Sequence, residues 1–220
     1  MNMEQQPSQK KRFDPKPGIV IILIVAIVGG GIWWWSENRH RFYPKRWGVV
    51  VPGNIYRSGQ LDQHLVAEIL QDHGVDLILC LRPHEPDQPD HLAEREAAEA
   101  LGIEMLEFDL SGDGTGNLEH FVTAVKTMDD VRQRGDQVLV HCAAGAYRTG
   151  VAVSFYRLLI EGADPATIRP ELLSYGWREK SDDKLIDYLN DNMPVMAERL
   201  QEEGVIDWIP DVIPRLPDAE

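Results

Sequence analysis

The feature that most restricts the fold of this chain is an uncharged apolar segment near its N-terminus. Residues 18–35 read GIVIILIVAIVGGGIWWW and contain no charged side chain. As a helix rising 1.5 Å per residue, the segment measures roughly 27 Å, close to the bilayer core of about 30 Å. Trp33, Trp34 and Trp35 then fall where the aromatic belt of the membrane interface lies. The segment therefore predicts a transmembrane helix in the lipid bilayer.

Two other structures fit this segment less well. A buried core helix would have to be apolar on all sides and capped by three tryptophans. A cleaved signal peptide fits the N-terminal position and the basic flank. Its apolar region, however, is shorter and ends at a small-x-small cleavage site, whereas tryptophans follow here. We therefore interpret residues 1–17 as a basic tail, 18–35 as an uncleaved signal anchor and 36–46 as a juxtamembrane linker.

The charges beside the anchor do not decide its orientation. Four basic residues precede it and four follow it before position 47, so the positive-inside count is a tie. A short basic N-terminus usually stays in the cytosol, which favours a non-cytoplasmic position for the rest of the chain. The eight basic and three acidic residues give residues 1–46 a net charge of +5, so the total of −14 leaves −19 for residues 47–220. Because nucleic-acid binding requires Lys and Arg to neutralise phosphates, we expect no nucleic-acid partner.

From residue 47 onwards, short apolar runs alternate with amphipathic segments. Short edge strands are expected at 49–51 and 54–57, and further strands at 75–81, 103–110 and 137–141. Helices are expected at 61–73, 91–101, 118–134, 149–160, 165–175 and 182–202. Strands that alternate with helices favour an α/β fold with a mostly parallel central sheet flanked by helices. We expect one domain at residues 47–203 and a C-terminal tail at 204–220.

The predicted strand at 137–141 leads directly into HCAAGAYRTG, residues 141–150, and then into a helix. In a tight strand-to-helix loop the backbone N–H groups converge, and the helix N-terminus adds its positive dipole end. The result is an anion cradle sized for phosphate. Cys142 at its base would ionise more readily in that field. Arg148 can fold its planar guanidinium over the same anion and bind two oxygens.

The other residues of this sequence complete the predicted cradle. Gly145 permits tight curvature, and Thr149 places a hydroxyl close to the sulfur. The cradle itself is formed by Ala143, Ala144, Gly145, Ala146 and Tyr147. A thiolate of Cys142 would attack phosphorus in line, and water would hydrolyse the phosphocysteine. The alternative is an inert buried cysteine beside a chance arginine, but six specified positions in a strand–loop–helix setting weigh against it.

HCAAGAYRTG resembles the signature loop, His-Cys-x5-Arg-Thr/Ser-Gly, of the Cys-dependent protein tyrosine and dual-specificity phosphatases. VPGNIYRSGQ at residues 51–60 and LCLR at 79–82 also look like the opening strands of bacterial and fungal members of the dual-specificity branch. The resemblance covers about residues 47–175. It implies the fold of that family, phosphomonoester hydrolysis, and neither a metal nor another cofactor.

The resemblance further implies a general acid on the loop at residues 108–116, because the leaving oxygen needs a proton. Asp113, between two glycines, fits an Asp-Gly pattern of relatives, and Asp109 at the strand end is the alternative. His141 is expected to hydrogen-bond backbone around Cys142 and tune its pKa, unless it is a plain buried histidine. Cys80 resembles in position a cysteine that traps the nucleophile as a disulfide in some members, and a simple packing role is the alternative.

The loop residues also bear on the substrate. Inositol-phosphate and phosphoinositide phosphatases of the superfamily carry Lys or Arg inside the x5 stretch, whereas residues 143–147 are all uncharged. Together with the acidic domain, this favours a phosphorylated protein, with phosphotyrosine first and phosphoserine or phosphothreonine next. A phosphoinositide or lipid phosphatase, suggested by the anchor, and a weakly active phosphate-binding module remain alternatives. Arg57 and Arg82 lie near strand ends, where they could face either the pocket or the solvent. The histidines show no metal-ligand spacing, so no metal site is predicted.

Overall fold

The computed structural model describes residues 17–179 and 184–217, and the chain divides into two units between Arg39 and His40. In the first unit, α1 (Pro17–Asn38) is a continuous helix, and a 3-10 turn, η1 (Arg39–Arg41), follows it. The stretch Gly18–Arg41 has a mean hydropathy of 2.3, and none of its residues is buried. By length and composition α1 can cross a membrane. The rest of the predicted basic tail, residues 1–16, lies outside the described residues.

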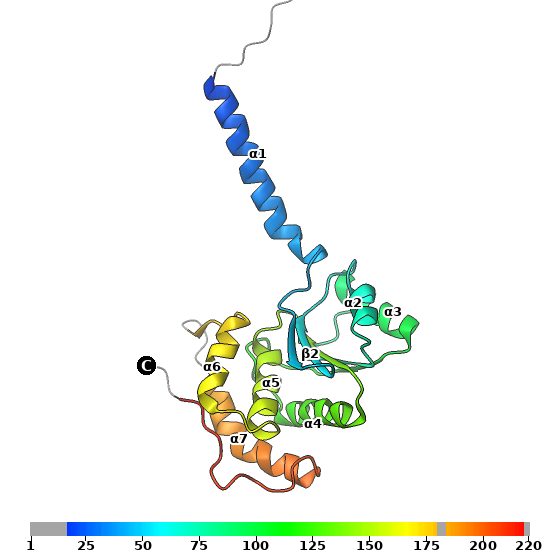
Figure 1. Ribbon diagram of the computed structural model, residues 1–220, viewed down its shortest axis with the longest axis vertical. Helices are drawn as coiled ribbons and strands as arrows, with labels where there is room; N and C mark the ends of the chain where they lie inside the picture. The colour runs from blue at the N-terminus through cyan, green and yellow to red at the C-terminus, as the bar shows by residue number, and fades with distance from the viewer. Residues whose placement is uncertain (1–16, 180–183, 218–220) are drawn as a thin grey trace, which may run out of the picture. The chain divides into compact units, whose positions relative to one another are not determined.

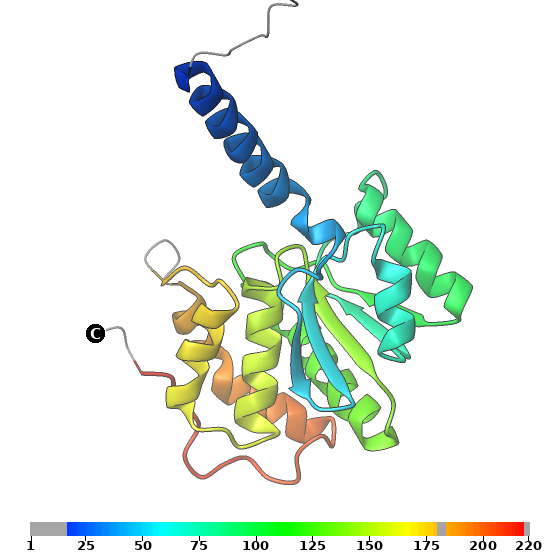
Figure 2. The same cartoon turned by 45° about the horizontal axis from the view of Figure 1, so that its top comes forward.

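In the second unit, five strands of the described chain form one sheet in the order β1-β2-β5-β3-β4. The strands are β1 (Gly48–Val51), β2 (Ile55–Gly59), β3 (Leu77–Cys80), β4 (Glu104–Glu107) and β5 (Val138–Cys142). Only β1 and β2 pair antiparallel; the other three pairs are parallel. Figures 1 and 2 show helices on both sides of the sheet. The predicted α/β fold with a mostly parallel, helix-flanked sheet is confirmed.

One strand prediction is wrong. We expected residues 54–57 to form an edge strand, but β2 lies inside the sheet between β1 and β5 and continues to Gly59. Arg57 and Ser58 in β2 are 1% and 0% exposed. The edges are β1 and β4, and β4 ends at Glu107, three residues before the predicted strand end.

The helices cover the two faces of the sheet with separate apolar clusters. They are α2 (Val66–Asp72), α3 (Pro89–Leu101), α4 (Leu118–Arg134), α5 (Tyr147–Leu159), α6 (Pro165–Ser174) and α7 (Lys184–Glu202). The smaller cluster joins α2 and α3 to Ile78 and Leu139, whereas the larger one joins α4, α5, α6 and α7 to Leu79 and Val140. Since strand side chains alternate between faces, this division fixes the side of the sheet on which each site residue lies.

The chain after α7 packs against the larger cluster. Leu216 is 1% exposed, and its backbone N–H and carbonyl exchange hydrogen bonds of 2.8 and 3.1 Å with the Asn190 side chain. Within the predicted tail at 204–220, the described residues thus contribute to the core. Residues 182–183 of the last predicted helix and residues 218–220 lie outside the described part.

Candidate active site

Cys142 ends the buried strand β5, and residues 143–146 join it to the start of α5 at Tyr147. The side chain is 1% exposed, and the Gly145 N–H donates a hydrogen bond of 3.2 Å to its Sγ. Burial alone would raise the pKa of the Cys142 thiol. The hydroxyl and N–H of Thr149, the charge of Arg148 and the N–H of Gly145 outweigh burial and lower that pKa. The structure therefore brings Cys142, Gly145, Arg148 and Thr149 together as predicted from their spacing.

Gly145 holds the loop against the end of β2. Its φ is +74°, and a Cβ there would lie 2.4 Å from the Gly59 nitrogen, so a larger residue cannot occupy this position without movement. The Gln60 N–H also donates to the Ala143 carbonyl at 3.3 Å. The loop thus packs directly against the backbone at the end of β2.

Three basic side chains hold the outer side of the same loop. Each donates to one of three successive loop carbonyls: Lys45 Nζ to Ala143 at 3.3 Å, Arg46 Nη1 to Ala144 at 2.8 Å and Arg57 Nη2 to Gly145 at 3.3 Å. Burial and the neighbouring Arg46 charge lower the pKa of Lys45. Carbonyls that point outward to cations leave the peptide N–H groups pointing inward, which is the arrangement an anion cradle needs.

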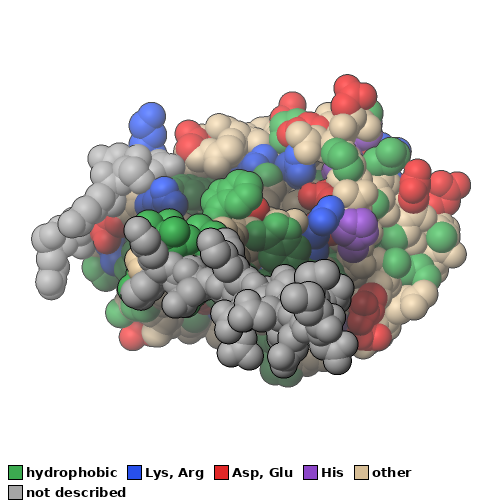
Figure 3. Space-filling view, turned by 90° about the horizontal axis from the view of Figure 1, so that it is seen from above, with side chains coloured by type: hydrophobic (Ala, Val, Ile, Leu, Met, Phe, Trp, Pro, Cys, Tyr) green, Lys and Arg blue, Asp and Glu red, His purple; other side chains and the backbone are tan. Residues whose placement is uncertain are grey.

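We did not predict a site role for Lys45 and Arg46, because both fall within the predicted linker. Arg57 and Arg82 were expected to face either the pocket or the solvent; they are buried, 1% and 7% exposed. Arg57 pairs with Glu171 at 3.1 Å and stacks on the Tyr175 ring at 3.7 Å. Lys and Arg side chains also gather near the middle of the face shown in Figure 3, although the domain as a whole is acidic.

Arg148 connects the cradle to the loop after β4. The residue is 8% exposed, and its Nη1 donates to the Leu110 carbonyl at 3.2 Å. Farther along this loop, a Cβ on Gly114 would lie 3.3 Å from the Tyr147 carbonyl carbon, so the loop packs on the first turn of α5. The predicted acid loop therefore lies beside the cradle.

The two candidate acids differ in their surroundings. The Asp113 carboxylate accepts hydrogen bonds from the N–H and the hydroxyl of Thr115, at 3.0 and 2.7 Å. Partial burial would raise the pKa of Asp113, but these two bonds outweigh it and lower the pKa. Asp109 is exposed at the end of the sheet. The contacts of Asp113 thus favour its ionised form in this conformation.

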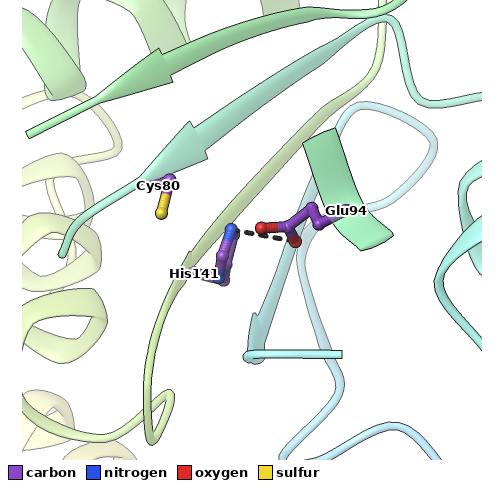
Figure 4. Close-up of side chains that lie close together, drawn as sticks. All are labelled: Cys80, Glu94 and His141. Atoms are coloured by element: carbon purple, nitrogen blue, oxygen red, sulfur yellow. Dashed lines mark ion pairs between the residues drawn. The ribbon is translucent and has the colours of Figure 1, made fainter. Parts of the chain in front are cut away.

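His141 has a different partner from the one we expected. We predicted hydrogen bonds to backbone near Cys142, but neither ring nitrogen makes one within the described chain. Instead Nε2 lies 3.2 Å from Oε1 of Glu94 on α3, and both side chains are 0% exposed (Figure 4). Burial alone would lower the pKa of His141, but the Glu94 carboxylate and the Cys80 thiol raise it well above its usual value. These two groups therefore favour an imidazolium at His141, the residue before Cys142.

Cys80 ends β3, the strand that pairs directly with β5. In the parallel register Cys80 is opposite His141, and its side chain lies near those of His141 and Glu94 (Figure 4). Cys142 follows His141 at the end of β5 and belongs to the larger apolar cluster. Both cysteines are free. The Cys80–Cys142 disulfide stays a prediction.

Comparison with known proteins agrees with this geometry. The model of the family described as "PTP-SAK: Swiss Army Knife protein, DSP-PTPase phosphatase domain" matches residues 44–193, more than half of the chain. The chain belongs to this phosphatase family. The match begins before Lys45 and Arg46, so it includes the basic residues that the sequence reasoning assigned to the linker. No curated protein matches the chain.

Solved phosphatase structures have a similar fold at low sequence identity. The P. aeruginosa protein TpbA is 20% identical over 67% of this chain and 84% of its own, with a TM-score of 0.54. A TpbA variant in complex with pTyr is 18% identical over 62% of this chain and 78% of its own, with a TM-score of 0.51. The catalytic core of the S. cerevisiae PP-IP phosphatase Siw14 is 20% identical over 76% of this chain and 96% of its own, with a TM-score of 0.56. These similarities establish the fold shared by these enzymes.

Proposed function

We propose that this phosphatase hydrolyses phosphomonoesters through a phosphocysteine on Cys142, with Arg148 binding the phosphoryl group. The observation that carries this proposal is the lowered pKa of the buried Cys142 thiol, at the base of a loop whose carbonyls bind cations on its outer side. A thiolate is the nucleophilic form of cysteine, and the inward N–H groups supply charge stabilisation where the phosphoryl oxygens lie.

The reaction has two steps. The Cys142 thiolate attacks phosphorus in line, so that a P–S bond forms while the bond to the leaving oxygen breaks, and the acid protonates that oxygen. Water then attacks phosphorus and gives a proton to the same carboxylate, and the P–S bond breaks to release phosphate and the thiolate. Thr149 stabilises the sulfur as it leaves. His141 carries the positive charge that favours the thiolate, and Glu94 keeps His141 protonated.

For the acid we retain Asp113, with Asp109 as the alternative. The Gly114 contact with Tyr147 supports Asp113, because it brings that part of the loop against α5. The bonds from Thr115 oppose it in this conformation, because they favour the carboxylate over the acid. A role for Asp113 therefore requires that substrate binding replaces the Thr115 contacts.

For the substrate we favour a phosphorylated protein, first at tyrosine. The x5 residues are small or aromatic and uncharged, which suits one phosphoryl group on an aromatic ring. The TpbA complex with pTyr is consistent with this choice.

One observation favours a second substrate class. Lys45 and Arg46 bring two positive charges to the loop from outside the x5 stretch, and buried Arg82 lies within electrostatic range of Lys45. Such charges suit a substrate with several phosphates, and Siw14 is named as a PP-IP phosphatase.

We also propose that residues 18–35 anchor the enzyme as a single-pass protein, with the domain on the non-cytoplasmic side. The exposed, apolar α1 supports the anchor. A protease added outside sealed, right-side-out vesicles of the anchoring membrane should then remove the domain; protection of the domain would place it on the cytoplasmic side.

The function is tested with the full chain in detergent and without added metal. Wild-type protein should hydrolyse p-nitrophenyl phosphate, and Cys142→Ser should not. A panel of phosphotyrosine, phosphoserine and phosphothreonine peptides, phosphoinositides and soluble inositol phosphates then separates the substrate classes. Preference for phosphotyrosine peptides supports the first candidate, whereas preference for multiply phosphorylated inositols supports the second. Activity that survives in Cys142→Ser contradicts the proposal.

A further inference from the structure

Four side chains with metal-binding atoms converge on the α3 side of the sheet, apart from the cradle. Cys80 ends β3, His84 follows it, His91 lies in α3 and Glu107 ends β4. The parallel register places Cys80 opposite Glu107, so their side chains lie on the same face. Segments far apart in the sequence thus meet at one edge of the fold.

The candidate ligand atoms lie close together. One atom each from Cys80, His91 and Glu107 lies within 4.8 Å of the other two. His91 Nε2 is 2.8 Å from Glu107 Oε1, and His84 Nδ1 is 3.3 Å from both of these atoms. Tetrahedral zinc has bonds of about 2.0–2.3 Å, which put its ligand atoms roughly 3.3–3.7 Å apart. Movement of the Cys80 side chain towards the other three would complete a coordination sphere.

Among the described residues, the buried ring of His91 has polar neighbours at one nitrogen only, Nε2. Its side chain is 0% exposed, and its Nδ1 has no hydrogen-bond partner in the described chain. His84 Nδ1 and Glu107 Oε1 both lie beside His91 Nε2. A cation among these three atoms would accept a lone pair from each.

Arg95 is the residue that neutralises this cluster in the structure. Its Nη1 lies 2.9 Å from His84 Nδ1 and 3.6 Å from Glu107 Oε2. The Arg95 side chain is 48% exposed, so it can turn into solvent when a cation takes its place. A surface cavity of about 640 Å³, lined in part by His84, His91 and Arg95, provides the route to the cluster.

We propose that Cys80, His84, His91 and Glu107 form a binding site for a thiophilic divalent cation such as Zn²⁺. Thiolate, imidazole and carboxylate together are a donor set that suits zinc. A second group, Cys80 with Glu94 and His141, also has its atoms within 4.8 Å of one another. That group is fully buried, whereas His84 and His91 of the first cluster line the surface cavity. The open cluster is therefore the site.

Cobalt binding tests the site independently of catalysis. The full chain in detergent carries Cys142→Ser, which leaves Cys80 as its only cysteine. Titration with Co²⁺ should give one bound ion and a sulfur-to-cobalt charge-transfer band in the near ultraviolet, and Zn²⁺ should abolish that band. Cys80→Ser should remove the band. Absence of the band from the Cys80-containing protein, or its persistence in Cys80→Ser, overturns the site.

His84→Asn keeps the test decisive if Cys80→Ser fails to fold, because the His84 side chain is 44% exposed. Since even second-shell changes reduce metal affinity about tenfold or more, loss of this ligand should weaken Co²⁺ binding at least as much. His64→Asn removes an exposed histidine outside the cluster and should leave the affinity unchanged. Equal affinities in His84→Asn and His64→Asn would overturn the assignment of His84 and, without a Cys80-dependent band, the site itself.

Discussion

His141 and Glu94 form an ion pair of 3.2 Å in which both side chains are fully buried, on the sheet face opposite the Cys142 side chain. The pair raises the pKa of His141 and lowers that of Glu94, in both cases against the effect of burial. A positive charge is thereby held one residue before the proposed nucleophile. This arrangement leads to the first two predictions.

Glu94→Gln should make the Cys142 thiol less acidic and destabilise the fold. Without the carboxylate, buried His141 loses its proton and Cys142 loses a nearby positive charge, so the alkylation profile with iodoacetamide should move to higher pH. Breaking a buried ion pair costs about 3–5 kcal/mol, which urea unfolding can measure. Glu99→Gln, an exposed change on the same helix, is the control. A folded Glu94→Gln protein with the wild-type alkylation profile would show that Glu94 does not act on Cys142.

The same pair makes stability depend on pH in a defined direction. The pKa of His141 is higher in the folded protein than in the unfolded chain, so protonated His141 stabilises the folded state. This stabilisation is fully present at pH values below the unfolded-chain pKa of about 6.5. It is lost as pH rises through the pKa that His141 has in the folded protein. The difference in unfolding free energy between wild type and Glu94→Gln should therefore shrink at alkaline pH. A difference that grows there would contradict a protonated His141.

The lowered pKa of Cys142 predicts reactivity at moderate pH. As pH rises, the rate of alkylation of wild-type Cys142 should reach its plateau at a pH below about 8.5, the pKa of an ordinary thiol. The reason is that the thiolate has already formed there. Inorganic phosphate, which competes for the cradle, should slow the reaction. Mass mapping separates Cys142 from Cys80. A plateau at a pH equal to or above the ordinary thiol pKa would mean that burial, which raises the pKa of Cys142, outweighs the contacts that lower it.

The general acid can be identified by the dependence on the leaving group. Asp113→Asn should reduce kcat strongly, on the order of 10²-fold or more, for aryl phosphates with poorly acidic phenols. It should change kcat little for those with highly acidic phenols, which leave without a proton. Asp109→Asn is the matched comparison. If Asp109→Asn shows this dependence and Asp113→Asn does not, Asp109 is the acid.

Gly145→Ala tests how closely the loop packs on β2. The new Cβ would lie 2.4 Å from the Gly59 nitrogen, in addition to the strain of a positive φ. Overpacking of this kind costs about 1–3 kcal/mol or more and should distort the cradle, which lowers kcat/KM. Gly53→Ala has a similar φ of +78° but no atom within 4 Å of the new Cβ, so it isolates the strain. Equal losses of activity in the two variants would contradict a role for close packing.

The parts of the site that were predictable from the sequence are local. HCAAGAYRTG encodes its own strand end, loop and helix start, so the positions of Cys142, Gly145, Arg148 and Thr149 follow from their spacing. Glu94 lies 47 positions before His141 and meets it only because α3 crosses the β5 face. Lys45 reaches Ala143 across 98 positions and precedes any recognisable pattern. Such pairings depend on the tertiary fold, and the pattern of apolar and polar residues within one segment does not reveal them.

The wrong edge-strand prediction for residues 54–57 has the same physical origin. The sequence does not show that β5 pairs with β2, or that Glu171 and Tyr175 neutralise and cover Arg57 inside the sheet. Both facts depend on residues more than 80 positions away.

Trapping the phosphocysteine shows whether Cys142 carries the phosphoryl group during turnover. The full chain is mixed in detergent with p-nitrophenyl phosphate, quenched with acid during turnover and digested for mass spectrometry. We expect one added phosphoryl group on the peptide with Cys142 and a larger trapped fraction in Asp113→Asn, whose second step lacks its base. Turnover without phosphorylated Cys142, or phosphorylation of another residue instead, would contradict nucleophilic attack by Cys142.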